Sequence, residues 1–359
     1  MRCYLSFLWI TVLFYPSINY GDSFTLYSRI DGFAYTEPVG FKSFTSDWSG
    51  RYYGGTHAQL NYLIEFGASY RDWGIGYVKQ KYLFMRFTED SANFYYLSEN
   101  KKPLQTDQGY DIDIDADYLV AEGVRLFKDF RPHTTLLVTL GASLLEGQEM
   151  LKGSLKGKIT ALSDSDYDFE NLNIDYFYTE DRLFDRQVDQ RNGQGYALDL
   201  RIAWQLNDTF TSKLTVSNLL GKIEWKQSHH TAALVESDNK EYDENGYVDV
   251  SPTLSGQHST KDFTQTLPRI VQLRLEQQLK PPVTGIVDIR HTTELTFSSI
   301  GLAYHFASQS SLEGLYTFNS NAFALGYYHR WGFLMLQADT LSLNKSRNLG
   351  IGLGINISI

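Results

Sequence analysis

The sequence predicts an all-β fold, a transmembrane antiparallel up-and-down β-barrel of about 14–16 strands that follows a cleaved signal peptide. Three observations predict it: an apolar N-terminal run, strand-like alternation of apolar and polar residues through the rest of the chain, and a separation of short from long connections. Of 359 residues, 42% are hydrophobic and 21% charged, which is enough apolar material for an ordered structure. A net charge of −10 argues against a nucleic-acid partner, and a single cysteine excludes a disulfide framework.

Residues 1–21 have the pattern of a secretory signal peptide. After a basic start, an uncharged apolar run extends from Cys3 to Tyr15, and mostly small or polar residues then lead to Gly21. The run is too short to span a bilayer as a helix, which takes about 20 residues. A buried N-terminal strand or helix is the alternative. We therefore expect residues 22–359 to form the folded barrel.

Residues of alternating polarity recur along the rest of the chain. In 57–70, for example, Leu60, Tyr62, Ile64 and Phe66 fall on one face of a strand, because successive side chains point to opposite faces. A soluble sandwich or propeller would bury such a face in a core, whereas a membrane barrel turns it toward lipid. Alternating stretches of around 10 to 14 residues, longer than the usual five or six, favour the barrel, as do aromatic residues near their ends.

The chain ends on an alternating strand, 348–359, whose last residue is hydrophobic. This ending resembles the C-terminal assembly signal of Gram-negative outer-membrane proteins, although Ile359 stands where an aromatic residue is more typical. We therefore expect an outer-membrane location, contact with outer-membrane lipid, and insertion by the barrel-assembly machinery.

We expect 16 strands, an even number that places both termini on the periplasmic side. The long connections 37–56, 88–107, 180–192 and 227–262 then all lie on the extracellular side, whereas the connections on the periplasmic side, 163–168 among them, are short, as is typical of these barrels. Merging of adjacent segments, or a plug formed by 22–56, would reduce the count to 14 or 12. The expected strands are 24–36, 57–70, 73–87, 108–127, 134–146, 149–162, 169–179, 193–206, 209–226, 263–279, 282–291, 299–307, 310–318, 321–331, 333–341 and 348–359.

Four aspartates on one strand face are the most unusual feature of the sequence. Asp111, Asp113, Asp115 and Asp117 form this aspartate ladder, in which successive carboxylates lie about six to seven ångströms apart on a rise of about 3.3 Å per residue. They would repel one another unless neutralised. A charged constriction that biases permeation is one interpretation, and a salt-bridge network that stiffens the wall is the other. Basic residues on the predicted polar faces of other strands are Lys156, Lys158, Arg201, Lys213 and Arg274.

The connection 227–262 is the largest and is acidic. It could bind divalent cations, contact an envelope partner, or form a solvated extracellular loop. Its candidate residues are Glu236, Asp238, Glu241, Asp243 and Glu244.

Catalytic and cofactor motifs are not found in the sequence. It contains no Gly-x-Ser-x-Gly, no His-Glu-x-x-His and no Gly-x-x-x-x-Gly-Lys. We therefore expect no catalytic residue, no metal site and no cofactor. Spacing alone leaves open a triad that uses His291, His305 or His329 with a serine and an aspartate.

Three short segments carry a family resemblance. Gly195–Leu200 (GYALDL), Val216–Gly221 (VSNLLG) and Phe263–Pro268 (FTQTLP) are similar to segments of outer-membrane barrels of the TraF-like and FadL-like families. The resemblance implies membership of the outer-membrane barrel class, in which transport and envelope-assembly roles are common. FadL-like transporters also carry an N-terminal plug, and 22–56 shows no clear counterpart, so their ligand residues are not transferred to this chain.

Three functions are consistent with these patterns. The first is a channel or transport protein with an acidic lumen, as the aspartate ladder indicates. The second is a non-conducting scaffold or accessory of an envelope export or assembly system, which presents 227–262 to a partner. The third is an enzyme that acts on lipid.

Overall fold

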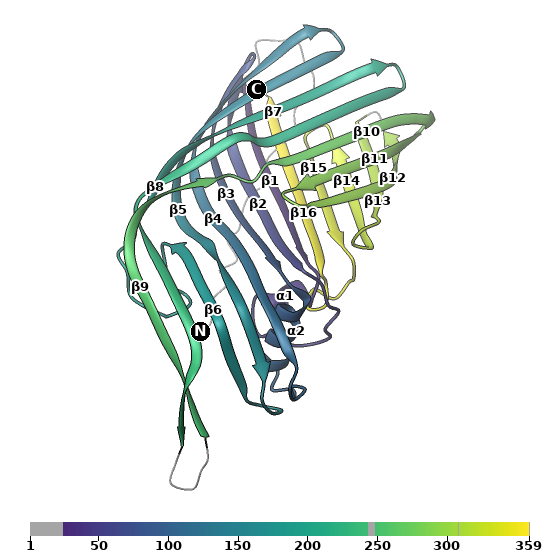
Figure 1. Cartoon of the computed structure of the whole chain (residues 1–359). Coiled ribbons are helices and arrows are strands. Elements are labelled where there is room, and N and C mark those ends of the chain that lie inside the picture. The colour runs from purple at the N-terminus through teal and green to yellow at the C-terminus, as the bar shows by residue number, and fades with distance from the viewer. Residues whose placement is uncertain (1–23, 243–247, 308, 359) are drawn as a thin grey trace.

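The computed structural model describes residues 24–242, 248–307 and 309–358, without the side chains of 238–254 and Ala307. The expected signal peptide, 1–21, lies outside these residues. They form one 16-stranded sheet and two short helices (Figure 1). No helix among the described residues is long and apolar enough to cross a membrane. The strands are β1 (Phe24–Thr36), β2 (His57–Tyr70), β3 (Trp73–Phe87), β4 (Gly109–His133), β5 (Leu136–Ala161), β6 (Tyr167–Tyr178), β7 (Gly193–Asn207), β8 (Phe210–Tyr242), β9 (Val248–Thr266), β10 (Ile270–Lys280), β11 (Val283–Thr292), β12 (Leu295–Ala307), β13 (Ser310–Thr317), β14 (Ala322–His329), β15 (Gly332–Ala338) and β16 (Asn348–Ser358), and the helices are α1 (Phe41–Phe44) and α2 (Glu89–Glu99).

The sheet closes on itself as an antiparallel barrel of 14 strands, which confirms the predicted fold class. β1 pairs with β16 from Thr25↔Ser358 to Tyr35↔Asn348, so the two ends of the chain close the ring. The 16 strands make a ring of 14 because two places in the ring are each filled by two strands, one following the other along the same neighbour. β6 pairs with the second half of β5 and β7 with its first half, and β9 and β10 follow one another along β8 in the same way.

Two predicted divisions of the chain into strands are wrong. The segments 134–146 and 149–162 are one strand, β5, because β4 pairs with its whole length and only a register shift beside Val120 marks the middle. The predicted strand 263–279 is divided into β9 and β10 around Pro268, whose missing N–H cannot join a ladder.

The barrel has two unlike ends. At the turn end, uppermost in Figure 1, lie the start of β1, the end of β16 and short turns such as Arg71-Asp72 and Thr134-Thr135. At the loop end lie the long connections 37–56 with α1 and 88–107 with α2, on the same side as each other, as predicted. The connection 163–168 was expected at the turn end; because β5 is one continuous strand, it lies at the loop end instead.

The predicted loop 227–262 is also wrong, because most of it is strand. These residues form the distal parts of β8 and β9, which pair with each other and project beyond the barrel at the loop end. β6 pairs with the same part of β8, from Leu172↔Val235 to Tyr178↔His229. The segment is polar and irregular in periodicity, so its strand character comes from pairing with distant residues rather than from its own pattern.

Helix α2 closes the sheet edge that β3 leaves open. β3 ends at Phe87, and the first residues of β4 extend beyond it. The Thr88 hydroxyl caps α2 by accepting from the Ser91 N–H at 3.1 Å. The Ser91 hydroxyl and the Asp90 carboxylate accept the N–H groups of Asp113 at 3.0 Å and Asp111 at 3.1 Å. The helix start therefore satisfies backbone groups that a further strand would otherwise bind.

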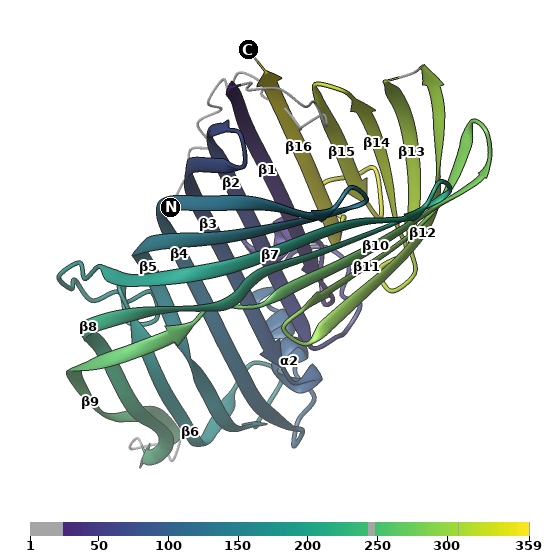
Figure 2. The same ribbon diagram turned by 90° about the horizontal axis from the view of Figure 1, so that it is seen from above.

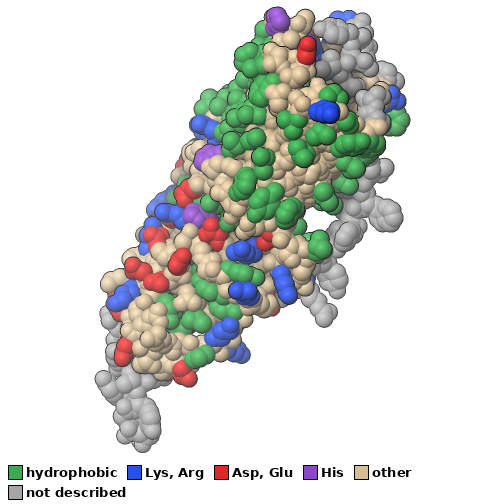
Figure 3. All heavy atoms as spheres, turned by 90° about the vertical axis from the view of Figure 1, so that its right-hand side faces the viewer, with side chains coloured by type: hydrophobic (Ala, Val, Ile, Leu, Met, Phe, Trp, Pro, Cys, Tyr) green, Lys and Arg blue, Asp and Glu red, His purple; other side chains and the backbone are tan. Residues whose placement is uncertain are grey.

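The outer face of the barrel is strongly apolar. Leu144, Phe323 and Leu325 are among many large apolar side chains that stay exposed on it. In Figure 3 hydrophobic side chains gather over the turn-end half of the surface in view, and charged side chains gather toward the loop end. Trp73 and Trp331 stand exposed at the turn end, beside Lys128 and Arg330. Exposed apolar surface of this extent, with an aromatic border, is what a lipid-facing belt requires.

Beyond this belt, toward the loop end, the outer face of β4, β5 and β6 is apolar but covered by protein. Tyr110, Ile112 and Ile159 are buried there, and Phe94 and Leu97 of α2 pack against the same cluster. The segment 180–192 covers a neighbouring part of this face through Phe184 and Val188. On this side of the barrel, lipid is therefore needed only around the turn-end part.

Candidate functional site

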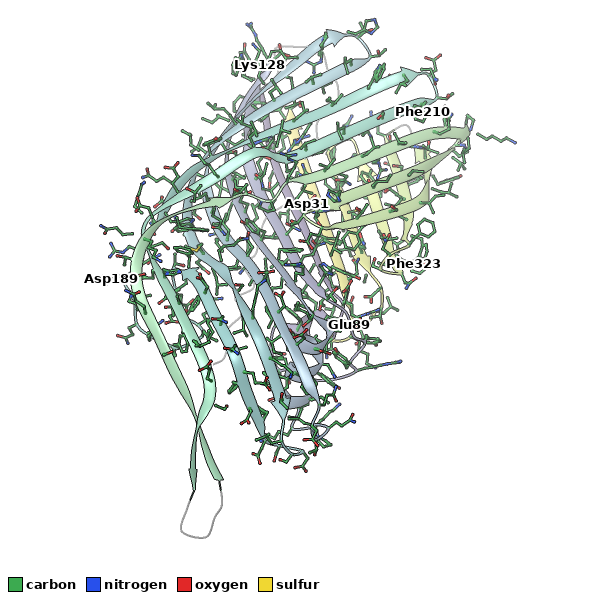
Figure 4. The ribbon with its side chains drawn as sticks, viewed as in Figure 1. Asp31, Glu89, Lys128, Asp189, Phe210 and Phe323 are labelled. Carbon is green, nitrogen blue, oxygen red and sulfur yellow. The ribbon has the colours of Figure 1, made fainter. Side chains whose placement is uncertain are left out.

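The lumen is the candidate functional site, because strand alternation turns the polar faces of the barrel inward. Asp31 lies at mid-height of the barrel, between Lys128 and Phe210 at the turn end and Glu89 at the loop end (Figure 4). In Figure 2 the wall made by β7, β8 and β10 passes in front of β1–β3. The ion pair of Arg201 in β7 with Glu65 in β2, at 3.6 Å, joins these two walls, so the interior is narrow rather than open.

A buried ionic cluster lies inside the wall of β2, β4 and β7. The Arg125 side chain is 3% exposed and donates to Glu65 Oε1 at 2.6 Å and to Asp199 Oδ2 at 3.0 Å. Glu65, also 3% exposed, lies 3.6 Å from Arg201 and accepts from the Tyr27 hydroxyl at 3.3 Å. We call these five residues the central cluster. It neutralises buried charges in pairs and fills this part of the lumen.

A second group narrows the lumen at mid-height. Asp31 of β1 accepts from Arg29 at 3.0 Å and from Arg290 of β11 at 3.4 Å. The Arg290 guanidinium also lies 4.9 Å above the Phe33 ring. These contacts tie β11 to β1 across the lumen, and we call Arg29, Asp31 and Arg290 the constriction. The cavity beside them measures only about 60 Å³, with Asn61, Gln80, Tyr82 and Gln272 also in its lining.

An apolar core fills one corner of the interior. Leu119, Met150, Ile223 and Trp225 are almost completely buried there, together with Leu267. The Trp225 indole donates to Gln265 Oε1 at 3.2 Å. The Gln265 amide in turn donates to Asp117 at 2.7 Å, and the Tyr82 hydroxyl reaches the Thr266 carbonyl at 3.4 Å. The strand β9 is thereby fixed against β3 and β4.

Larger cavities lie on either side of the constriction. The cavity at the turn end has a volume of about 330 Å³, and its lining includes the ion pairs Arg274–Glu313, at 2.5 Å, and Lys213–Glu276, at 2.9 Å. The cavity at the loop end has a volume of about 530 Å³. Charged residues in its lining are Asp111, Asp113, Lys156, Lys158 and Glu170.

The aspartate ladder is largely neutralised by neighbouring basic side chains. Lys152 contacts Asp117 at 2.6 Å, and Lys156 contacts Asp113 at 3.1 Å and Asp115 at 3.7 Å. Arg86 forms a further ion pair with Asp115. Asp111 forms no ion pair within the described residues. This pairing favours the interpretation of the ladder as a salt-bridge network in the wall.

The structure places the basic residues predicted on polar strand faces in different parts of the interior. Lys156 reaches the ladder, whereas Lys158 contacts Glu170 at 3.6 Å. Arg201 belongs to the central cluster, and Lys213 and Arg274 line the turn-end cavity. Sequence reasoning did not single out Lys152, Arg86, the constriction, or the other members of the central cluster. Arg125 stands on the same face of β4 as the aspartate ladder, an even number of residues away, so alternation could have indicated that it points inward.

The acidic residues expected in 227–262 are only partly described. Glu236 is half-buried in β8. The side chains of Asp238, Glu241, Asp243 and Glu244 lie outside the described residues. Among the described residues, no three His, Cys, Asp or Glu side chains are grouped so that they could hold a metal ion.

Histidines of the projecting strands hold the segment 180–192 in place. The His229 Nε2 lies 2.9 Å from the Asp189 carbonyl, and the His229 ring stacks 5.5 Å from that of His258. Arg186 forms an ion pair with Asp181 and donates to Thr231 at 2.6 Å. Burial, and then the nearby positive charge of Arg186, lower the pKa of His258. For Asp181, burial acts against ionisation, but hydrogen bonds from Tyr176 and Arg186 outweigh it and lower the pKa.

Comparison with known proteins finds similarity only at the level of solved structures. No protein-family model matches the chain, and no curated protein matches it significantly. Similar solved structures include a TodX mutant described as a monoaromatic hydrocarbon channel, at 12% identity over 94% of this chain and 90% of that chain, with a TM-score of 0.47. They also include the Pseudomonas putida toluene transporter TodX, at 11% identity over 94% of this chain and 89% of that chain, with a TM-score of 0.43. A Pseudomonas aeruginosa FadL homologue is 8% identical over 94% of this chain and 88% of that chain, with a TM-score of 0.34. A FadL homologue is thus among the solved structures to which this chain is similar.

Proposed function

We propose that the protein is an outer-membrane channel of a Gram-negative bacterium whose lumen is closed at rest and opens for a small solute. The apolar outer belt suits a lipid environment, and the polar lumen suits passage of solutes. The observation that carries the proposal is the narrowing of the lumen at mid-height, where a cavity of about 60 Å³ beside the constriction lies between an open hollow at the loop end and a cavity of about 330 Å³ at the turn end.

The small cavity beside the constriction indicates what the closed lumen can pass. Its 60 Å³ has room for only a few water molecules, since each needs roughly 10–15 Å³ of such volume. A hydrated ion or an organic solute therefore passes only when the constriction moves. Arg290 is the group best placed to move, because Asp31 keeps Arg29 at 3.0 Å when Arg290 leaves. Opening would then leave no buried carboxylate without a partner.

Whether the lumen is acidic depends on the charged side chains that line the loop-end cavity. Of the four ladder aspartates, three are paired with basic residues and only Asp111 has no ion pair in the described part of the chain. Rings of charged side chains bias permeation when their charge is uncompensated. We therefore expect weak cation preference, with its origin at Asp111, rather than strong selectivity from all four carboxylates.

Single-channel conductance of the refolded protein in a planar bilayer tests the proposal. We expect small or brief openings for the natural protein and larger, longer openings for Arg290→Ala, which widens the constriction. Arg330→Ala is the matched control, because it removes an arginine that stacks on Trp331 outside the lumen. Absence of conductance in the natural protein and in Arg290→Ala, with both correctly folded, would refute the channel.

A scaffold role is the second candidate, favoured by the projecting hairpin of β8 and β9. β9 pairs with β8 on one side, and the sheet order places no other described strand on its far side along this hairpin. An open strand edge can accept a strand from a partner. Deletion of 230–258 tests this role: it should abolish co-purification of an envelope component, and unchanged recovery would contradict the scaffold.

The enzyme hypothesis retains one arrangement of side chains. His230 lies 3.1 Å from Asp175 Oδ1 through Nε2 and 3.4 Å from the Ser259 hydroxyl through Nδ1. A serine triad buries its carboxylate to orient the histidine, whereas the Asp175 side chain is 63% exposed. This geometry suits a polar link between β6, β8 and β9. Loss of any lipid hydrolysis in Ser259→Ala would be needed to support catalysis.

A further inference from the structure

Two loop-end segments that are distant in the sequence are joined by hydrogen bonds into one surface on the outside of the barrel. The Phe41 N–H donates to the Ser346 carbonyl at 2.8 Å, and the Thr36 N–H donates to the Arg347 carbonyl at 2.9 Å. Lys42 Nζ donates to Asn344 Oδ1 at 3.0 Å. Segments 37–56 and 339–347 are therefore held together at the boundary between β1 and β16.

This surface carries unusually exposed leucines. Leu341 is 104% exposed and Leu343 is 65% exposed, so neither is covered by protein. They follow β15, whose outward side chains Leu334 and Leu336 belong to the apolar belt. On the neighbouring hairpin, Phe318 is likewise exposed at the loop end. The apolar belt thus continues onto Leu341 and Leu343, whose exposed side chains suit contact with lipid.

Basic side chains belong to the same two segments. The guanidinium of Arg347 lies 4.3 Å from the centre of the Tyr53 ring, and that of Arg51 lies 5.0 Å from it. Within the described residues neither arginine forms an ion pair with a carboxylate, and the same holds for Lys42 and Lys345.

The nearby carboxylates are already engaged with backbone groups. Asp339 accepts the N–H of Arg347 at 3.0 Å and that of Asn348 at 3.2 Å. Glu37 accepts the N–H of Thr56 at 2.6 Å and that of His57 at 3.1 Å. Two guanidinium groups on one ring, neither of them in an ion pair within the described residues, offer donors to an external anion, and arginine forks suit phosphate.

We propose that this surface, the loop-end rim formed by Lys42, Arg51, Lys345 and Arg347 with Leu341 and Leu343, docks a phosphorylated lipid of the outer leaflet. The leucines enter the acyl region and the four cations bind the phosphate groups. Charge complementarity and continuity with the apolar belt select a lipid over a soluble anion. The proposal rests on the membrane placement of the barrel and is independent of whether the lumen conducts.

Native mass spectrometry of the detergent-purified barrel tests the lipid rim with bisphosphorylated lipid A as the probe. We expect lipid adducts with the natural protein. The double variant Arg51→Gln/Lys345→Gln should bind about tenfold more weakly, since each surface cation contributes roughly one order of magnitude or less. The variant Leu341→Ser/Leu343→Ser should also bind more weakly. Arg131→Gln/Lys128→Gln at the turn end is the matched control and should bind as the natural protein does. Dephosphorylated lipid A should bind weakly throughout.

Several results would overturn the proposal. Equal binding of phosphorylated and dephosphorylated lipid A, or unchanged binding by Arg51→Gln/Lys345→Gln, removes the role of the cations. Full displacement by inorganic phosphate at millimolar concentration identifies a soluble-anion site instead of a lipid site. Retained heat-modifiability of each variant shows that it is folded. A barrel that inserts and conducts but shows no lipid selectivity contradicts this inference alone, whereas a protein that does not insert contradicts the proposed function.

Discussion

Replacement of Arg125 by leucine is the sharpest test of a packed lumen. In the natural protein the Arg125 guanidinium holds Glu65 at 2.6 Å and Asp199 at 3.0 Å, with Arg125 and Glu65 each 3% exposed. In Arg125→Leu, Asp199 keeps the Asn218 N–H at 2.9 Å, but Glu65 keeps only Arg201 at 3.6 Å and the Tyr27 hydroxyl at 3.3 Å. Removing one partner of a buried pair costs about 3–5 kcal/mol, because the other charge is left in a poorly solvated place.

The free energy of unfolding is measured by denaturant titration in lipid vesicles, with tryptophan fluorescence as the readout. The double variant Arg125→Leu/Glu65→Leu removes the orphaned carboxylate and should recover much of the loss. Arg131→Leu is the matched control, because Arg131 forms an exposed ion pair with Asp72 at 2.9 Å, and such pairs contribute about 0–1 kcal/mol. If Arg125→Leu costs no more than Arg131→Leu, or if the double variant is as unstable as the single, water screens the cluster and the reasoning is wrong.

Three further predictions concern the ladder, the helix and the histidines. Asp113→Asn/Asp115→Asn frees Lys156 and Arg86, so the reversal potential should shift toward anions while stability changes by less than about 1 kcal/mol; an unchanged reversal potential would place the ladder outside the permeation path. Thr88→Ala removes the cap of α2 at a cost of about 1 kcal/mol, which should appear as roughly fivefold faster hydrogen exchange in the helix and not in the barrel. Burial and Arg186 lower the pKa of His258 in the folded state, so the His258 ring binds a proton more readily when its packing against this region opens. Acidification below about pH 6.5 should therefore loosen the segment 180–192. A spin label at Leu183→Cys should become more mobile at pH 5.5 than at pH 7.5, with His258→Gln abolishing the difference; equal pH dependence in both proteins would exclude His258 as the cause.

Sequence patterns were sufficient where a strand begins and ends at strong local signals. The predicted ranges 24–36, 57–70 and 73–87 coincide with β1, β2 and β3, because each combines clear alternation with polar or glycine-containing flanks. Errors arose where long-range pairing decides the outcome. β5 is continuous because β4 pairs along all of it, and the distal part of β8 is a strand because β6 and β9 lie on either side.

For the lumen too, the sequence pattern predicted which residues face inward but not which residues they contact. Alternation placed Arg201, Lys213 and Arg274 on polar faces, and all three lie inside the barrel. Alternation does not give register, so it could not reveal that Arg125 meets Glu65 and Asp199, respectively 60 and 74 residues away in the chain. The ladder illustrates the point: its neutralisation follows from the Asp117↔Lys152 and Asp113↔Lys156 register of β4 and β5.

The pairing of β1 with β16 constrains how the molecule can form. The Thr25 and Ser358 hydroxyls, which are hydrogen-bonded at 3.1 Å, are separated by 333 residues, so the seam of the ring is made of the most distant contacts in the chain. Contacts of such separation form slowly, because their loop-closure entropy is lost before any pairing energy is gained. Until synthesis and delivery of the final strand are complete, the N-terminal strand presents an open edge that other chains can join. Shielding that edge is therefore a kinetic requirement, and truncation of even the last few residues should favour aggregation over insertion.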